Sequence, residues 1–184
     1  MKKENLQKLT LSAMMIALST VLSLFKIWEM PLGGAITPLS MLPVCLISIA
    51  YGTKYAIAPC FLYGAIQMML SGVFGWGLTP WILIGAILFD YLVAFGMLCL
   101  AGIFRNRGIL GAVSGITVAC IVRFICHFIS GCVFFRSFEI FGNPYLYSVA
   151  YNGTFMLPEL ILTVVGAVIL IKVPVIRKLF NIKE

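Results

Sequence analysis

Charged residues are scarce in this sequence of 184 residues. Only 10% of the residues are charged, whereas 62% are hydrophobic, and the mean hydropathy is +1.10. A soluble globular domain carries about 25% charged residues. The composition therefore excludes a soluble protein and predicts an integral membrane protein, with residues 1–184 forming one membrane domain and no separate soluble domain.

Motifs for catalysis are missing as well. The sequence has no nucleophile elbow, no histidine–glutamate zinc helix and no phosphate-binding glycine loop followed by Lys and Ser or Thr. It has one histidine, His127, and its six cysteines lie in apolar runs without the spacing of a zinc or redox site. We expect neither an enzyme nor a bound metal or cofactor, and we interpret the cysteines as small buried side chains.

Basic residues outnumber acidic ones, 13 to 6. No basic stripe with interleaved aromatic residues is present, so we do not expect nucleic acid as a partner. The basic residues lie mostly in the tails and short connections, which indicates topology because Lys and Arg concentrate in cytoplasmic loops. With the N-terminus inside, the outer face carries only Lys26 and Arg136. The inner face carries Lys2, Lys3, Lys8, Lys54, Arg105, Arg107, Lys172, Arg177, Lys178 and Lys183. We therefore predict that both termini are cytoplasmic.

Six apolar runs predict an all-α bundle of six transmembrane helices. They cover about 9–27, 40–51, 55–70, 79–104, 109–135 and 147–173. The second run is short for a hydrocarbon core of ~30 Å. No small-residue cleavage site follows the first run, so we interpret it as an uncleaved span. The outer connections are long and rich in Gly, Pro and aromatic residues, whereas the inner ones are tight, which predicts a site capped from outside.

Polar residues on the fourth, fifth and sixth spans lie at similar depths. A helix rises about 1.5 Å per residue, which puts Asp90, His127 and Asn152 within roughly 8–17 Å of the outer edge of the membrane. A charge in the hydrocarbon layer costs roughly 2.5–3.5 kcal/mol, so such residues usually face a partner or a cavity. We predict an outward-open binding pocket. Its candidate residues are Asp90, Tyr91, Arg123, His127, Tyr147, Asn152 and Glu159.

Five of these candidates also have a structural alternative. Asp90 and Arg123 would form an ion pair, because an unpaired buried charge is costly. His127 would hydrogen-bond a backbone carbonyl, and Asn152 would link two helices. Glu159 would bind backbone groups freed at a proline kink or would pair with Arg123. Under these alternatives the chain would be a structural membrane subunit without a ligand.

The first predicted span carries small residues on one face. Ala13 and Ala17 are four residues apart, a spacing that lets a second helix approach closely. The sequence leaves two interpretations open, a docking surface for a partner and ordinary packing inside the bundle.

Several stretches resemble the substrate-binding S components of energy-coupling factor (ECF) vitamin transporters, and among them the thiamine-specific S component. They are LFDYLVA at 88–94, RFICHFISG at 123–131 and YSVAYNG at 147–153, together with the predicted first outer loop at 33–43. The resemblance covers nearly the whole chain. It implies six spans, cytoplasmic termini, and docking on a coupling subunit through Ala13 and Ala17.

The resemblance also implies roles for the candidate residues. Asp90 would face the cationic thiazolium of thiamine, while His127, Tyr147 and Asn152 would line the pocket. The sequence departs from the family pattern in places: the acid is often Glu but here is Asp90, and Phe135 stands where a family member has Trp. The first outer loop also lacks an expected Trp, whose stacking role would then fall to Trp76, Trp81 or Tyr91.

The implied function is high-affinity capture of thiamine at the outer face of a prokaryotic plasma membrane. Delivery would require an ECF transmembrane coupling protein and two cytoplasmic ATPases, since the chain has no nucleotide-binding motif. A flat cation suits an aromatic site, where cation–π contacts contribute about 0.5–2 kcal/mol each. An S component for another vitamin or precursor is the alternative on the same scaffold.

Overall fold

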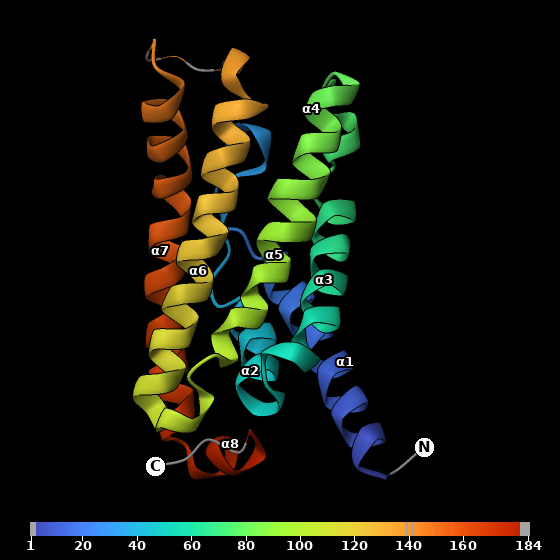
Figure 1. The fold of residues 1–184 in the computed structure, drawn as a ribbon, viewed down its shortest axis with the longest axis vertical. Helices are drawn as coiled ribbons and strands as arrows, with labels where there is room; N and C mark the ends of the chain where they lie inside the picture. The colour runs from blue at the N-terminus through green and yellow to red at the C-terminus, as the bar shows by residue number, and fades with distance from the viewer. Residues whose placement is uncertain (1–2, 139, 141, 181–184) are drawn as a thin grey trace.

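The computed structural model describes residues 3–138, 140 and 142–180, which fold into a long bundle of helices (Figure 1). Five helical segments are long and apolar enough to cross a membrane. They are Lys3–Ser23, Thr53–Gly75, Pro80–Gly102, Arg105–Val133 and Pro144–Lys172. A mostly helical membrane architecture is thereby confirmed. The predicted second span forms only α2 (Leu42–Tyr51), whose 10 residues rise about 15 Å, half of the hydrocarbon core. A count of six spanning helices stays a prediction.

The five long segments are built from several elements. The first is α1 (Lys3–Ser23), and the second is α3 (Thr53–Leu70) with the 3-10 turn η2 (Val73–Gly75) after it. The third contains α4 (Pro80–Gly85), η3 (Ala86–Val93), α5 (Ala94–Gly96) and the 3-10 helix η4 (Met97–Gly102). The remaining elements are η5 (Arg105–Arg107), α6 (Gly108–Val133), η6 (Arg136–Phe138), α7 (Pro144–Lys172) and α8 (Pro174–Leu179).

Two helices begin earlier than the hydrophobic pattern predicts, because polar residues stabilise their first turns. In α1 the Nζ atom of Lys8 lies 2.7 Å from a carboxylate oxygen of Glu4, an i,i+4 ion pair that supports the helix ahead of the apolar run. At the start of α7, Asn143 Oδ1 accepts hydrogen bonds from the backbone N–H groups of Tyr145 and Leu146 at 2.9 and 3.2 Å. Hydrophobicity alone does not detect such N-caps.

The segment between α1 and α2 forms a small hairpin instead of helix. Strands β1 (Trp28–Glu29) and β2 (Ala35–Ile36) pair antiparallel, and the short 3-10 turn η1 (Pro31–Gly33) joins them. The blue hairpin lies behind α6 in the upper half of Figure 1. Its second strand, β2, packs against α7.

The fourth predicted span contains a wide turn. Residues 86–93 form the π-helix η3, in which hydrogen bonds run from i to i+5, and Asp90 lies within it. Gly64 of α3 packs so closely on this stretch that a Cβ there would lie 2.7 Å from the carbonyl oxygen of Tyr91. Single π turns inside α-helices often occur at functional sites.

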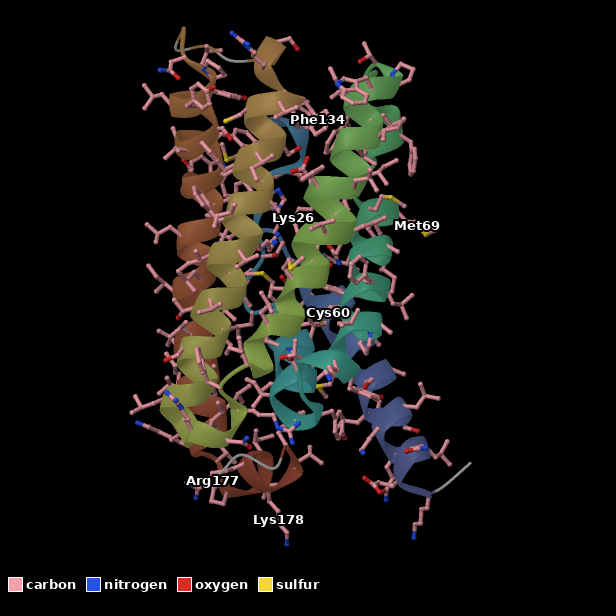
Figure 2. The ribbon with its side chains drawn as sticks, in the orientation of Figure 1. Lys26, Cys60, Met69, Phe134, Arg177 and Lys178 are labelled. Carbon is pink, nitrogen blue, oxygen red and sulfur yellow. The ribbon has the colours of Figure 1, made fainter. Side chains whose placement is uncertain are left out.

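The start of α1 and helix α8 lie at the same end of the bundle (Figure 1). Figure 2 shows the basic residues Arg177 and Lys178 at this end, while Met69 on α3 points away from the bundle. The arrangement is compatible with the predicted cytoplasmic termini, which stay a prediction. All six cysteines are free, five are buried and Cys132 is half-buried, which confirms their interpretation as small packed residues.

Helix α1 presents two different faces. Its buried face is formed by Ser12, Ile16, Ser19 and Ser23. Ala13 and Ala17 are exposed on the other side of the helix. The alternative in which these alanines pack inside the bundle is therefore wrong, and their small-residue face is open to a partner or to lipid.

Candidate functional site

A cavity of about 560 Å³ lies between the hairpin and helices α3, η3, α6 and α7. All nine predicted binding residues line it, although they come from distant parts of the sequence. They are Trp76, Asp90, Tyr91, Arg123, His127, Phe135, Tyr147, Asn152 and Glu159. The structure thus brings the candidates together, and ligand binding by them stays a prediction.

The Asp90 carboxylate is held by two side chains of α6. Its Oδ1 lies 2.9 Å from Nδ1 of His127, and its Oδ2 accepts a hydrogen bond of 2.7 Å from Oγ of Ser130. Two of the structural alternatives are therefore wrong: Asp90 does not pair with Arg123, and the His127 ring binds a carboxylate rather than a backbone carbonyl. The second ring nitrogen of His127, Nε2, is buried without a hydrogen-bond partner among the described residues.

Arg123 and Glu159 form a deeply buried ion pair. Nη1 of Arg123 lies 3.0 Å from Oε2 of Glu159, and the two side chains are only 6% and 3% exposed. The guanidinium also sits over the ring of Phe95, 4.4 Å from its centroid. Oε1 of Glu159 accepts hydrogen bonds from both the backbone N–H and the hydroxyl of Thr37, at 3.0 and 2.5 Å. The predicted pairing of Glu159 with Arg123 is confirmed, and the same carboxylate anchors the segment that follows the hairpin.

The charges around the cavity do not cancel. Lys26 and Glu29 pair with each other, with Nζ 2.5 Å from Oε1, and Arg123 neutralises Glu159. Three acidic residues line the cavity (Glu29, Asp90 and Glu159), but only two basic residues do (Lys26 and Arg123). With the imidazole neutral, the net charge of the lining is −1, and it resides on Asp90. Such a cavity favours a cationic ligand.

Aromatic rings form one wall of the cavity. Tyr147, Tyr151 and Phe155 follow one another at four-residue spacing on α7, with successive ring centroids 5.8 and 5.9 Å apart. The His127 ring stands edge-on to Phe155, with centroids 6.1 Å apart. Trp76 and Tyr91 also line the cavity, whereas Trp81 is 65% exposed and lies outside it. Of the three aromatic residues proposed for stacking, Trp76 and Tyr91 are thus in position.

Asn152 lies at the contact between α6 and α7. Its Nδ2 donates to the backbone carbonyl of Ser148 at 2.9 Å and reaches the carbonyl of His127 at 3.4 Å. The helices approach closely nearby, since a Cβ at Gly131 would lie 2.2 Å from Oγ of Ser148. The amide therefore links the two helices, as one alternative predicted, and it also lines the cavity.

Sequence reasoning missed several lining residues. Tyr151 and Phe155 lie between Tyr147 and Glu159 at successive four-residue steps, so all four share one face of the helix. The helical spacing would therefore have predicted them. Residues in and beside the hairpin, and in and just after α3, gave no comparable signal, because only the tertiary fold brings them to the cavity. They include Lys26, Glu29, Thr37, Ser40, Tyr63, Gln67 and Ser71.

Comparison with known proteins identifies the family. Residues 9–179 match the family model described as thiamine transporter protein (Thia_YuaJ). The chain belongs to this family. Thiamine transporter ThiT of Bacillus subtilis (strain 168) is 30% identical, with 88% of each chain covered. A solved structure of ThiT from Listeria monocytogenes superposes with a TM-score of 0.80 over 97% of this chain and 99% of that one. At 22% identity this second similarity establishes the shared fold.

Membership confirms three of the sequence predictions. The resemblance to thiamine transport proteins holds over almost the whole chain. The role is transport and not catalysis, as the lack of catalytic motifs predicts. With five apolar helices long enough to span a bilayer, the chain is a multi-pass protein of the cell membrane.

Proposed function

We propose that this protein is a thiamine-specific S component that binds thiamine from the outer side of the membrane. The observation that carries the proposal is the Asp90 carboxylate, the one acid of this aromatic-walled cavity that has no Lys or Arg partner among the described residues. Thiamine is a monocation made of two flat heteroaromatic rings. One fixed negative charge is the counter-charge that such a ligand needs in a site of low polarity.

The remaining walls of the cavity also suit thiamine. The rings of Tyr147, Tyr151 and Trp76 offer faces for stacking and for cation–π contact, worth about 0.5–2 kcal/mol each. Asn152 and Tyr147 carry groups that can donate or accept hydrogen bonds to an aminopyrimidine. A ligand of this size fills a pocket of several hundred Å³, the usual range for small-molecule sites.

Delivery of the ligand requires partners in this proposal. The sequence has no phosphate-binding loop, so the energy for uptake comes from two cytoplasmic ATPases acting through an ECF transmembrane coupling protein. Ala13 and Ala17 are exposed on α1, and small residues four apart allow close helix contact. We assign the docking of the coupling protein to this face.

The proposal is tested by binding measurements on the purified full chain in detergent. Tryptophan emission is recorded while thiamine, riboflavin, biotin or pantothenate is added. Saturable quenching by thiamine alone supports the proposal. Selective quenching by a different vitamin would show that the protein binds another substrate. If no vitamin quenches the emission, the interpretation as a structural subunit without a ligand would hold instead. Co-purification of the tagged chain with a coupling protein and two ATPases, when these are co-expressed, tests the partners.

A further inference from the structure

Ser130 contributes to the site without lining it. Its side chain is completely buried, and its hydroxyl donates to Oδ2 of Asp90 at 2.7 Å. Ser130 follows His127 by three residues on α6, so both side chains point to the same side of the helix. Together they engage one carboxylate oxygen each.

The Ser130 hydroxyl does not make the local hydrogen bond that several other hydroxyls in the bundle make. Ser and Thr side chains inside helices commonly donate to the carbonyl three or four residues earlier. Five residues here do so: Thr20, Ser23, Thr117, Thr154 and Thr163. A hydroxyl has one proton to donate, and Ser130 gives it to an acid 40 positions away in the sequence. Local helix geometry therefore does not explain this contact.

The two donors from α6 act on the acid in a defined way. Hydrogen bonds to a charged carboxylate are about twice as strong as those between neutral groups, so the two contacts hold the Asp90 side chain firmly. They also fix the rotation of the carboxylate plane, because each oxygen has its own partner. A carboxylate has about four lone-pair positions, so two remain for a ligand in the cavity.

We propose that Ser130 is a positioning residue that gives the site its preference for a cation over a neutral molecule of the same shape. It acts through Asp90 and does not touch the ligand. The inference rests on the proposed function, since it takes thiamine as the cation. It predicts that loss of the Ser130 hydroxyl weakens recognition of charge and leaves recognition of shape intact.

The experiment compares two ligands on the full-length protein in detergent. One is thiamine, and the other is deazathiamine, an uncharged analogue in which carbon replaces the thiazolium nitrogen. Ser130→Ala should weaken thiamine binding by about tenfold or more, because a hydrogen bond to a charged group is lost. Deazathiamine binding should change by less than about threefold. The readout is the ratio of the two dissociation constants, which a general loss of packing would not alter.

Two further variants make the test specific. Ser48→Ala is the matched control, since Ser48 is equally buried and bonds Gly102 and Cys99 away from the cavity. It should leave the ratio unchanged. In an Asp90→Asn background, Ser130→Ala should have no further effect on the ratio, because the charge through which it acts is absent.

The possible outcomes distinguish a failure of this inference from a failure of the proposed function. The positioning role is overturned if Ser130→Ala weakens the binding of both ligands equally, or if its effect on the ratio is undiminished in the Asp90→Asn background. In either case the wild type still binds thiamine, and the proposed function stands. A wild-type protein that binds neither ligand would overturn the proposed function and this inference with it. If Ser130→Ala does not fold, Ser130→Cys, nearly isosteric but a weak donor, should show the same selective loss for thiamine.

Discussion

The indole of Trp76 lies directly against the backbone of Gly33, so that a Cβ at Gly33 would be 2.4 Å from Cη2 of the ring. Gly33 also has a φ of +89°, a conformation that side-chain-bearing residues rarely adopt. The hairpin and the connection between α3 and α4 therefore meet beside the cavity, at a place where only glycine fits.

Gly33→Ala should displace either the hairpin or the indole. We expect about tenfold weaker thiamine binding and a changed tryptophan emission spectrum, since both backbone strain and a steric clash oppose the native contact. Gly142→Ala is the matched control, because Gly142 has a similar φ of +68° but a Cβ there would meet nothing within 4 Å. If the two variants behave alike, strain alone explains the effect and the contact with Trp76 is unimportant.

Asp90→Asn should weaken thiamine binding well beyond tenfold while the protein stays folded. Removing one partner of a desolvated charge pair costs about 2–5 kcal/mol. Isothermal titration calorimetry of the purified variant, together with its thermal unfolding curve, gives both quantities. An unchanged affinity in a folded Asp90→Asn protein would show that the carboxylate does not face the ligand.

Arg123→Met should destabilise the bundle strongly, because it leaves the Glu159 carboxylate buried without its counter-charge. The expected loss is about 3–5 kcal/mol in the free energy of unfolding. The double variant Arg123→Met/Glu159→Met should recover much of this loss, since no uncompensated charge remains. Unfolding in denaturant measures the three stabilities. Simple additivity of the two single changes would mean that the ion pair is not a coupled unit.

Tyr151→Phe should loosen the hairpin. The Tyr151 hydroxyl accepts a hydrogen bond of 3.0 Å from the backbone N–H of Gly34 and donates to the carbonyl of Pro31. Their removal costs about 0.5–1.5 kcal/mol each, so amide hydrogen exchange in residues 30–36 should accelerate. Tyr145→Phe, on the same helix but 63% exposed, should leave that exchange unchanged.

Ala13→Trp and Ala17→Trp should abolish thiamine uptake by cells but spare binding by the isolated subunit. Both alanines are exposed on α1, and bulky side chains would prevent close approach of a partner helix. Met14→Trp is the control, because Met14 is 60% exposed on the same helix and already carries a long side chain. Uptake that survives both alanine variants would exclude this face as the docking surface.

The shared level of the site residues along their helices could be predicted from the sequence, whereas the pairing among them could be predicted only in part. Rise per residue is nearly constant along a helix, so Asp90, His127 and Asn152 could be placed at one level without any structure. Lateral neighbours depend on how helices rotate and pack. For this reason the Asp90–Arg123 pair, one of the structural alternatives, is wrong, and the contact of Asp90 with His127 was not predicted, whereas the alternative pairing of Arg123 with Glu159 is confirmed. The rotation of Asp90 is especially hard to predict, because it lies in a π-helix and not in a helix of 3.6 residues per turn.

The hairpin was the other unpredictable feature. Its Gly and Pro content indicated that 31–38 would not be a regular helix, but strands of two residues give no periodic pattern. Its position depends on single long-range contacts, such as those of Thr37 with Glu159 and of Gly34 with Tyr151. Contacts of this kind, more than a hundred residues apart in sequence, are fixed only when the whole bundle is formed.

The π-helix at 86–93 makes the direction of Asp90 depend on the number of residues in the span as well as on their identity. Deleting one residue upstream of Asp90 would let the span revert to a regular helix and would turn the acid by about 100° around the axis. The acid would then lose both partners on α6 although every side chain of the site is still encoded. A sequence alignment that places no gap in this stretch would hide such a change in the direction of Asp90. Insertions and deletions here therefore carry as much functional information as substitutions.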